Sequence, residues 1–225
     1  MSTAPPPIIN GELQLSKRTP ESLTSDNAAD DLERLMQADG FSKWGFVIYR
    51  CTYTNGADWE AFMARIYDAV IEYLELYNGL DMLDSFAPTV IEDRAAFEGA
   101  TTATLREHFV NTWVPSAFPG ENPGLDMDVL SGVEAGRYRF FIMIDEESLR
   151  SVLDATVDGI NRTGFVRLVQ ADWGAKRSYI VDEEDEEAAP VLGWNECEPL
   201  DGCILQDVGW MNVLYDHVEA MGTWI

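Results

Sequence analysis

The sequence predicts an α+β domain of the ferredoxin-like (split βαβ) class: an antiparallel sheet with helices on one face, an inserted helix and an acidic C-terminal extension. Two observations predict this class. Segments rich in β-branched and aromatic residues are interleaved with segments of helical apolar spacing, in the order β-α-β-β-α-β. The chain of 225 residues is 46% hydrophobic, which is enough for one sizeable core.

The first part of the chain supplies the first strand and the longest helix. Residues 1–24 read as an irregular arm because three prolines stand together near its start, and residues 25–225 read as a single domain. Residues 44–53 are dense in β-branched and aromatic side chains, which predicts a strand. Over residues 58–77 the apolar positions recur at helical spacing, which predicts one long amphipathic helix.

A shorter helix is expected before that first strand. It covers residues 26–38, and Gly40 suits its C-terminal cap.

The middle of the chain predicts a weak strand and the inserted helix. Residues 86–92 favour a short strand, which Pro88 confines to a sheet edge because proline cannot donate a hydrogen bond to a neighbour. Residues 101–114 have helical spacing, and Pro115 is expected to end that helix. Residues 115–136 are rich in proline and glycine and are expected to form a long loop.

The second half of the domain repeats the strand-helix-strand order. Residues 137–145 and 164–172 predict strands, and residues 146–156 predict a helix between them. Asp145 is suited to cap that helix, since its side chain can accept from the first backbone N–H groups. The strand at 44–53 is then expected to lie between the strands at 137–145 and 164–172, as in ferredoxin-like sheets.

The charge balance is strongly acidic. Forty Asp and Glu oppose 15 Lys and Arg, a formal net charge of −25, which disfavours nucleic acid and anionic membrane surfaces as partners. Residues 182–206, with six consecutive acids at 182–187, read as a solvated loop, and residues 207–213 as an edge strand or a short helix.

The compartment that the sequence favours is the cytoplasm. The first residues lack the basic and apolar segments of a secretory signal, and no apolar run reaches the roughly 18 residues of a membrane helix. The three cysteines form no CxxC pair and are expected to be reduced.

Side-chain alternation suggests a ligand-binding face. It assigns Val47, Tyr49 and Cys51 to the helix-covered core and puts three arginines on the opposite, half-apolar face of the sheet. With two apolar neighbours they form the predicted ligand-binding set: Arg50, Arg139, Arg167, Phe141 and Met143. Arginine pairs bidentately with carboxylate or phosphate, so the set predicts a site for a small anionic or phenolic ligand. The simpler alternative is that these arginines pair with the chain's own carboxylates.

Three residues are weak candidates for catalysis. His108 and His217 are the only imidazoles of the chain and could transfer protons near neutral pH. Asp145 follows a strand and could act with the acids beside it, although a helix cap explains it more simply. No spacing specifies a metal, and no GxGxxG, GxxxxGK[ST] or GxSxG sequence is present, so neither a metal nor a cofactor is expected.

Several stretches carry a family resemblance when taken together: WGFVIYRCTY, VIEDRAAFEGATTATLREHF, RYRFFIMIDEESLRSVL, GFVRLVQADW and DVGWM. Over about residues 41 to 213 the chain resembles a family of uncharacterised intracellular proteins of filamentous fungi. The resemblance implies a fungal, non-secreted setting and no assigned activity. The segment from Asn212 to Ile225 departs from it.

Two functions follow as alternatives. In the first, the open face of the sheet binds a small ligand and hosts a cofactor-independent isomerase, cyclase or lyase, by analogy with dimeric α/β-barrel proteins. In the second, the chain is a non-catalytic interaction module whose acidic segment docks a basic partner, while the open face serves as a protein interface, including that of a homodimer.

Overall fold

A computed structural model of the chain describes residue 18 and residues 27–131, 136–154, 164–171 and 203–207. Apart from Arg18, the predicted arm at 1–24 lies outside the described residues. So do His217, residues 208–213 and the predicted acidic loop as far as residue 202.

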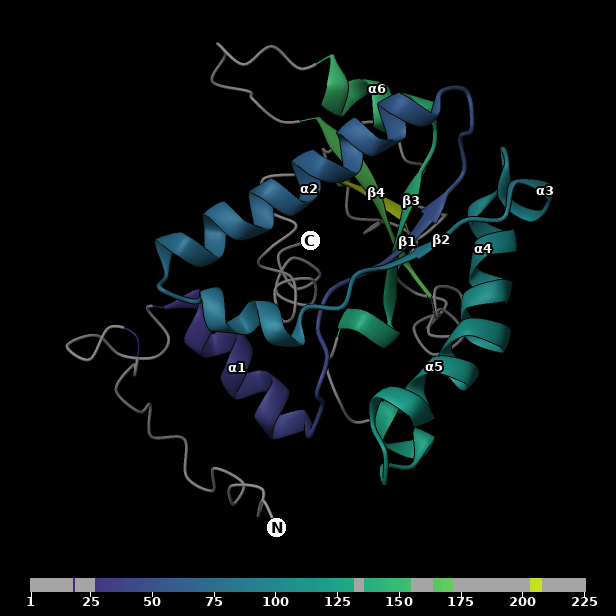
Figure 1. Cartoon of the computed structure of the whole chain (residues 1–225). Coiled ribbons are helices and arrows are strands. Elements are labelled where there is room, and N and C mark those ends of the chain that lie inside the picture. Colours follow the sequence, from purple (N-terminus) through teal and green to yellow (C-terminus); the bar gives the residue numbers. More distant parts are fainter. Residues whose placement is uncertain (1–17, 19–26, 132–135, 155–163, 172–202, 208–225) are drawn as a thin grey trace, which may run out of the picture.

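The sheet is mixed and open, with the strand order β2-β1-β3-β4-β5 (Figure 1). The strands are β1 (Val47–Arg50), β2 (Thr89–Ile91), β3 (Phe140–Ile144), β4 (Phe165–Gln170) and β5 (Cys203–Asp207). β1 runs parallel to both of its neighbours, whereas β4 runs antiparallel to β3 and β5. The predicted acidic loop at 182–206 was therefore wrong at its end, because residues 203–206 belong to β5.

One helix precedes β1, and the others lie in the connections between the strands. They are α1 (Ala28–Asp39), α2 (Gly56–Leu76), α3 (Arg94–Phe97), α4 (Thr102–His108), α5 (Val114–Glu121) and α6 (Glu146–Leu153). The predicted helices at 26–38, 58–77 and 146–156 thus correspond to α1, α2 and α6. As expected, Gly40 caps α1 in the left-handed conformation and the Asp145 side chain caps α6.

The α+β class is confirmed, but the predicted antiparallel strand arrangement is wrong. β1 lies between β2 and β3, not between β3 and β4. The reason is the crossover through α2, which returns the chain in the original direction and places β2 parallel to β1. The antiparallel pairing that the sequence predicts for the strands at 137–145 and 164–172 is present between β3 and β4.

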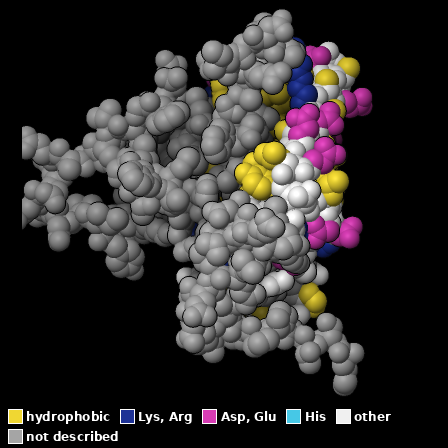
Figure 2. Space-filling model, turned by 90° about the vertical axis from the view of Figure 1, so that its left-hand side faces the viewer, with side chains coloured by type: hydrophobic (Ala, Val, Ile, Leu, Met, Phe, Trp, Pro, Cys, Tyr) yellow, Lys and Arg dark blue, Asp and Glu magenta, His cyan; other side chains and the backbone are white. Residues whose placement is uncertain are grey.

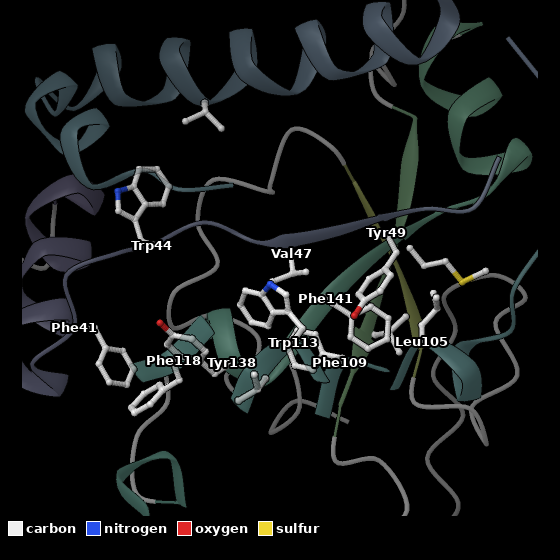
Figure 3. Close-up of a cluster of buried hydrophobic side chains, with 14 of the residues drawn as sticks. Phe41, Trp44, Val47, Tyr49, Leu105, Phe109, Trp113, Phe118, Tyr138 and Phe141 are labelled. Atoms are coloured by element: carbon white, nitrogen blue, oxygen red, sulfur yellow. The ribbon is translucent and has the colours of Figure 1, made fainter. Parts of the chain in front are cut away.

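Helices cover both faces of the sheet, which corrects the prediction of an open face. On the first face, here the α2/α6 face, side chains of the sheet pack against α2 and α6; they are Phe46, Ile48, Phe140, Ile142, Ile144, Val166 and Leu168. On the second, the α4/α5 face, Val47, Tyr49 and Phe141 pack against the segment at 102–121 (Figure 3). Val169 of β4 belongs to the same cluster. A homodimer formed through an open sheet face loses its basis, because the chain's own inserted segment occupies that face.

That inserted segment is longer than the sequence predicts. Pro115 was expected to end it, yet α5 continues to Glu121. Residues 109–113 form a π-helix between α4 and α5, and Pro115 follows directly as the second residue of α5. Because the helix continues, its buried Phe109, Trp113 and Phe118 reach along the sheet.

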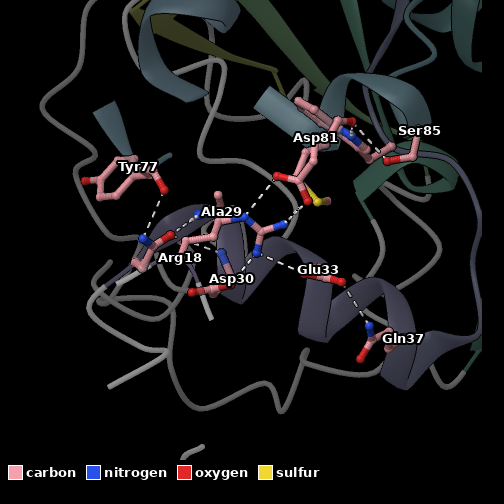
Figure 4. A network of polar contacts seen from close by, with 11 residues as sticks. Arg18, Ala29, Asp30, Glu33, Gln37, Tyr77, Asp81 and Ser85 are labelled. Atoms are coloured by element: carbon pink, nitrogen blue, oxygen red, sulfur yellow. Dashed lines mark hydrogen bonds and ion pairs between the residues drawn. The ribbon is translucent and has the colours of Figure 1, made fainter. Parts of the chain in front are cut away.

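Arg18 joins α1 to the 3₁₀ turn at 80–85 (Figure 4). Its guanidinium pairs with Asp30 and Glu33 of α1 and with Asp81 of that turn. The side chain of Arg18 is buried, so three carboxylates compensate its desolvation.

Arg137 is an extensively bonded buried cation at the start of the sheet. Its Nη1 donates to the backbone oxygens of Gly45 (2.8 Å) and Ala87 (2.7 Å), which precede β1 and β2. Nε and Nη2 donate to both carboxylate oxygens of Glu121 at the end of α5, at 2.8 and 2.6 Å. Burial opposes the ionisation of Glu121, but hydrogen bonds from Arg137 and Tyr138 outweigh it and lower the pKa of the carboxyl group.

Arg137→Ala is expected to lower the free energy of unfolding by about 3–5 kcal/mol, because it strands the charge of Glu121 and two backbone oxygens inside the protein. Urea denaturation at pH 7 measures the loss. Arg94→Ala is the matched control: that side chain is 66% exposed, pairs with Glu98 and lies 5.9 Å from the ring of Tyr53, so its removal should cost much less than that of Arg137. Equal losses in the two variants would contradict the central role given to Arg137.

Candidate functional site

The three arginines predicted to form a ligand platform do not lie together. Arg50 aligns with Ile144, on the α2/α6 face, whereas Arg167 aligns with Met143, on the α4/α5 face. Arg139 precedes β3, and Arg50 ends the parallel β1, so the two stand at opposite ends of the sheet. The prediction of a shared face was wrong because the β1–β3 register pairs Val47 with Phe141, one position away from the register that it requires.

Two of these arginines pair with the chain's own acids, as the simpler alternative expected. Arg167 Nε lies 2.6 Å from Asp145 and its Nη2 lies 2.5 Å from Glu147. Arg50 Nη1 lies 3.4 Å from Glu92, and the same guanidinium sits over the rings of Tyr53 (4.5 Å) and Trp59 (4.8 Å).

The remaining members of the predicted ligand-binding set contact the hydrophobic core or the ring of Phe140. Arg139 lies over the ring of Phe140 at 5.8 Å. Phe141 and Met143 are buried in the cluster beneath α4 and α5 and do not line an open surface. Asp145 caps α6 and pairs with Arg167, so its carboxylate is committed to structure.

The carboxyl ends of the parallel strands β2, β1 and β3 form one edge of the sheet, and this edge is the favoured place for a ligand-binding or catalytic site. In open sheets with parallel strands, ligands bind outside this edge because the loops that follow the strands converge there. Here those loops contribute Cys51 to Asn55 after β1, Glu92 and Asp93 after β2, and Asp145 after β3. The backbone N–H of Gly99 donates to the Cys51 oxygen at 3.0 Å, which fixes the loop after β2 against the end of β1.

Tyr49 and His108 form a hydrogen-bonded pair at this edge. The hydroxyl of Tyr49, on β1, lies 2.8 Å from Nδ1 of His108, the last residue of α4. Phe97 of α3 packs edge-on against both rings, at centroid distances of 5.3 Å from Tyr49 and 5.0 Å from His108. The pair therefore joins the centre of the sheet to the inserted helix within an aromatic environment.

Burial keeps both groups of the pair neutral near pH 7. Desolvation lowers the pKa of His108, and the nearby charge of Asp93 opposes that shift without reversing it. Desolvation also raises the pKa of Tyr49, with a smaller contribution from Cys51. Cys51 itself is buried, and its pKa is raised to about 12, so it is an inert thiol at neutral pH.

The hydrogen bond with Tyr49 determines which tautomer His108 adopts. Tyr49 is fully buried, and His108 is the single hydrogen-bond partner of its hydroxyl among the described residues. A buried O–H left without an acceptor costs more than a spare lone pair, so Tyr49 donates to Nδ1. The proton of the neutral imidazole is then on Nε2, which faces away from Tyr49 and has no acceptor in the described part of the chain. The pair thus leaves one N–H donor, Nε2–H, without an acceptor among the described residues.

The described residues offer no obvious metal site and no membrane helix. Within residues 27–131, 136–154, 164–171 and 203–207, no group of three His, Cys, Asp or Glu side chains is placed to hold a metal ion. In the same ranges, no helix combines the length and the apolar character needed to cross a bilayer.

Comparison with known proteins gives no match to a protein-family model, to a curated protein or to a solved structure.

The sequence identified His108 as a candidate but missed its partner. Tyr49 was assigned to core packing because it alternates with Val47 and Cys51, and that assignment of burial is correct. No spacing in the sequence connects Tyr49 with a residue 59 positions later. The available signal was weaker: a phenol in a buried strand needs a partner for its hydroxyl.

We expect the stability of the protein to fall as the pH is lowered from 7 through 6, because the unfolded chain binds a proton at the imidazole of residue 108 before the folded chain does. The contribution cannot exceed a slope of about 1.4 kcal/mol per pH unit for one imidazole. Urea denaturation at several pH values measures it, and NMR titration of the imidazole gives the pKa directly.

His108→Asn should remove this part of the pH dependence, whereas His217→Gln is the matched control for the other imidazole of the chain. A His108 pKa at or above 6.5 in the folded protein would contradict the assignment.

Proposed function

We propose that this protein binds a small organic molecule with a carbonyl or phenolic oxygen at the carboxyl edge of its parallel strands. The observation that supports this proposal most directly is the hydrogen bond from Tyr49 to Nδ1 of His108, because it leaves Nε2–H as an outward donor. A neutral donor in an aromatic setting is suited to an oxygen acceptor on an apolar ligand.

A phenolic or carbonyl ligand fits this edge better than a strongly anionic one. Arg50 and Arg167, the cations near the edge that the sequence singled out, already pair with Glu92 and with Asp145 and Glu147. The chain's net charge of −25 further disfavours the approach of an anion.

The chemistry that such a site can support is proton transfer without a cofactor, as in an isomerase, cyclase or lyase. A neutral imidazole N–H stabilises the negative charge that develops on a carbonyl oxygen when a proton leaves the neighbouring carbon. Asp93 caps α3 through Oδ1, which accepts from the backbone N–H groups of Ala95 and Ala96, and its charge acts on His108. We place its second oxygen, Oδ2, as the acceptor of that proton. In this proposal Tyr49 is a positioning residue, because it fixes the tautomer of His108.

We expect 4-hydroxyacetophenone and 4-methylphenol to raise the thermal unfolding midpoint in a concentration-dependent way, and 4-methylbenzoate at equal concentration to raise it less. His108→Asn should weaken binding of the phenols at least tenfold, because the amide can replace Nδ1 but not the outward N–H. Chemical-shift changes of the His108 imidazole on titration locate the binding.

His217→Gln serves as the control variant, with an unchanged Kd expected. Two results would contradict the proposal: stabilisation by the benzoate that equals or exceeds that by the phenols, or an unchanged phenol affinity in His108→Asn.

A further inference from the structure

The outer face of α2, which points away from the sheet, carries exposed apolar side chains. The helix is anchored to the sheet by Trp59, Phe62 and Ile66, all of which are buried. On its outer side, Tyr67 is 40% exposed and Ile71 is 37% exposed, and their spacing of four residues places them next to each other on the helix surface.

Tyr67 also has a contact outside α2, and two further apolar side chains are exposed where the helix ends. Tyr67 packs edge-on against Phe86, at 5.9 Å between ring centroids, so its ring is held in place while it is partly open to solvent. Leu76 is 72% exposed at the end of α2, and Leu80 is exposed at the start of the 3₁₀ turn.

The same surface holds carboxylates that have no cation. Residues 56–85 contain seven Asp and Glu and one basic residue, Arg65, whose Nη1 donates to the backbone oxygen of Val152. Two of the seven are neutralised, Asp58 by Arg150 and Asp81 by Arg18. The other five have no ion-pair partner in the chain as far as the structure describes it; they are Glu60, Asp68, Glu72, Glu75 and Asp84. Figure 2 shows acidic and hydrophobic side chains close together along the described edge of one face, with few basic ones.

The unpaired carboxylates repel one another along the helix. Asp68 and Glu72 are four residues apart, and Glu72 and Glu75 are three apart, so both pairs are neighbours of like charge on the exposed surface. Such pairs destabilise a helix, and bound cationic side chains would relieve the repulsion. A second copy of this chain would bring more acid to the same place, which argues against self-association through this surface.

We propose that the outer face of α2, defined by Tyr67, Ile71 and the surrounding carboxylates, is a docking surface for a basic amphipathic segment of a partner protein. The apolar residues of the partner would cover Tyr67 and Ile71, and its lysines or arginines would pair with Asp68 and Glu72. Such a helix-in-groove or helix-on-helix contact is specified by apolar anchors at spacing of three or four residues and by complementary charge around them. This inference is independent of the ligand site at His108, which is on the α4/α5 side of the sheet.

The test uses a fluorescein-labelled 14-residue peptide of leucine and lysine that forms an amphipathic helix, and a scrambled peptide of the same composition without an apolar face. Fluorescence anisotropy of the full chain with each peptide gives the Kd at low and high salt. We expect the amphipathic peptide to bind at least tenfold tighter than the scrambled one, with an affinity that falls as salt rises.

Two variants of the surface separate its components. Tyr67→Ser combined with Ile71→Ser should weaken the amphipathic peptide at least tenfold, and Ile71→Ser alone should weaken it measurably. Asp68→Asn combined with Glu72→Gln should weaken binding at low salt and reduce its salt dependence. The matched control is Val110→Ser, which removes an exposed apolar side chain on the inserted segment and should leave the Kd unchanged.

Equal affinity for the two peptides would overturn the proposal, because it would reduce the interaction to net charge. An unchanged Kd in the Tyr67 and Ile71 double variant would overturn it as well, because the peptide would then bind elsewhere on the chain.

Discussion

The guanidinium of Arg137 is the interaction on which the rest of this structure depends. Strands β1 and β2 begin beside each other, and the backbone oxygens of Gly45 and Ala87 at that point both accept from this one side chain. The same group pairs with Glu121, so the end of α5 is joined to the start of the sheet. Its side chain is 1% exposed, and a charge at that depth is tolerated because all three of its nitrogens have acceptors.

The contacts of Arg137 also affect the position of the Tyr49–His108 pair at the other end of the sheet. Arg137 fixes where β1 begins and where the inserted segment ends, and the Tyr49–His108 pair spans the same two elements. Two contacts at opposite ends therefore hold the inserted segment over the sheet, and the aromatic cluster of Phe109, Trp113 and Phe118 fills the space between them. The position of the His108 imidazole is thus a property of the whole layer and not of its own helix alone.

Local features of the fold could be read from the sequence, whereas relations between strands could not. The long helix, the first strand and the caps at Gly40 and Asp145 depend on residues close to one another in the chain, and the structure has them. Which side chains of neighbouring strands share a face depends on the register between the strands. The alternation of residues within one strand does not determine that register. The sequence did not indicate the role of Arg137 either. This residue lies in a segment whose composition predicts a strand, but the segment forms a 3₁₀ turn before β3. Nor did the sequence connect His108, which was singled out as a candidate, with Tyr49, which was assigned to packing.

The π-helix at 109–113 has a geometric consequence for the inserted segment. A π turn holds one residue more than an α turn, and each residue of a regular helix advances the side-chain direction by roughly 100°. A chain one residue shorter at this point would form an uninterrupted helix through α4 and α5, with α4 rotated by that angle relative to α5. Phe118 could keep its place in the core and Glu121 its ion pair with Arg137, while His108 turned away from Tyr49. The extra residue therefore changes the direction of the side chains between α4 and α5. It allows Glu121 to reach Arg137 at the amino edge of the sheet while His108 reaches Tyr49 at the carboxyl edge.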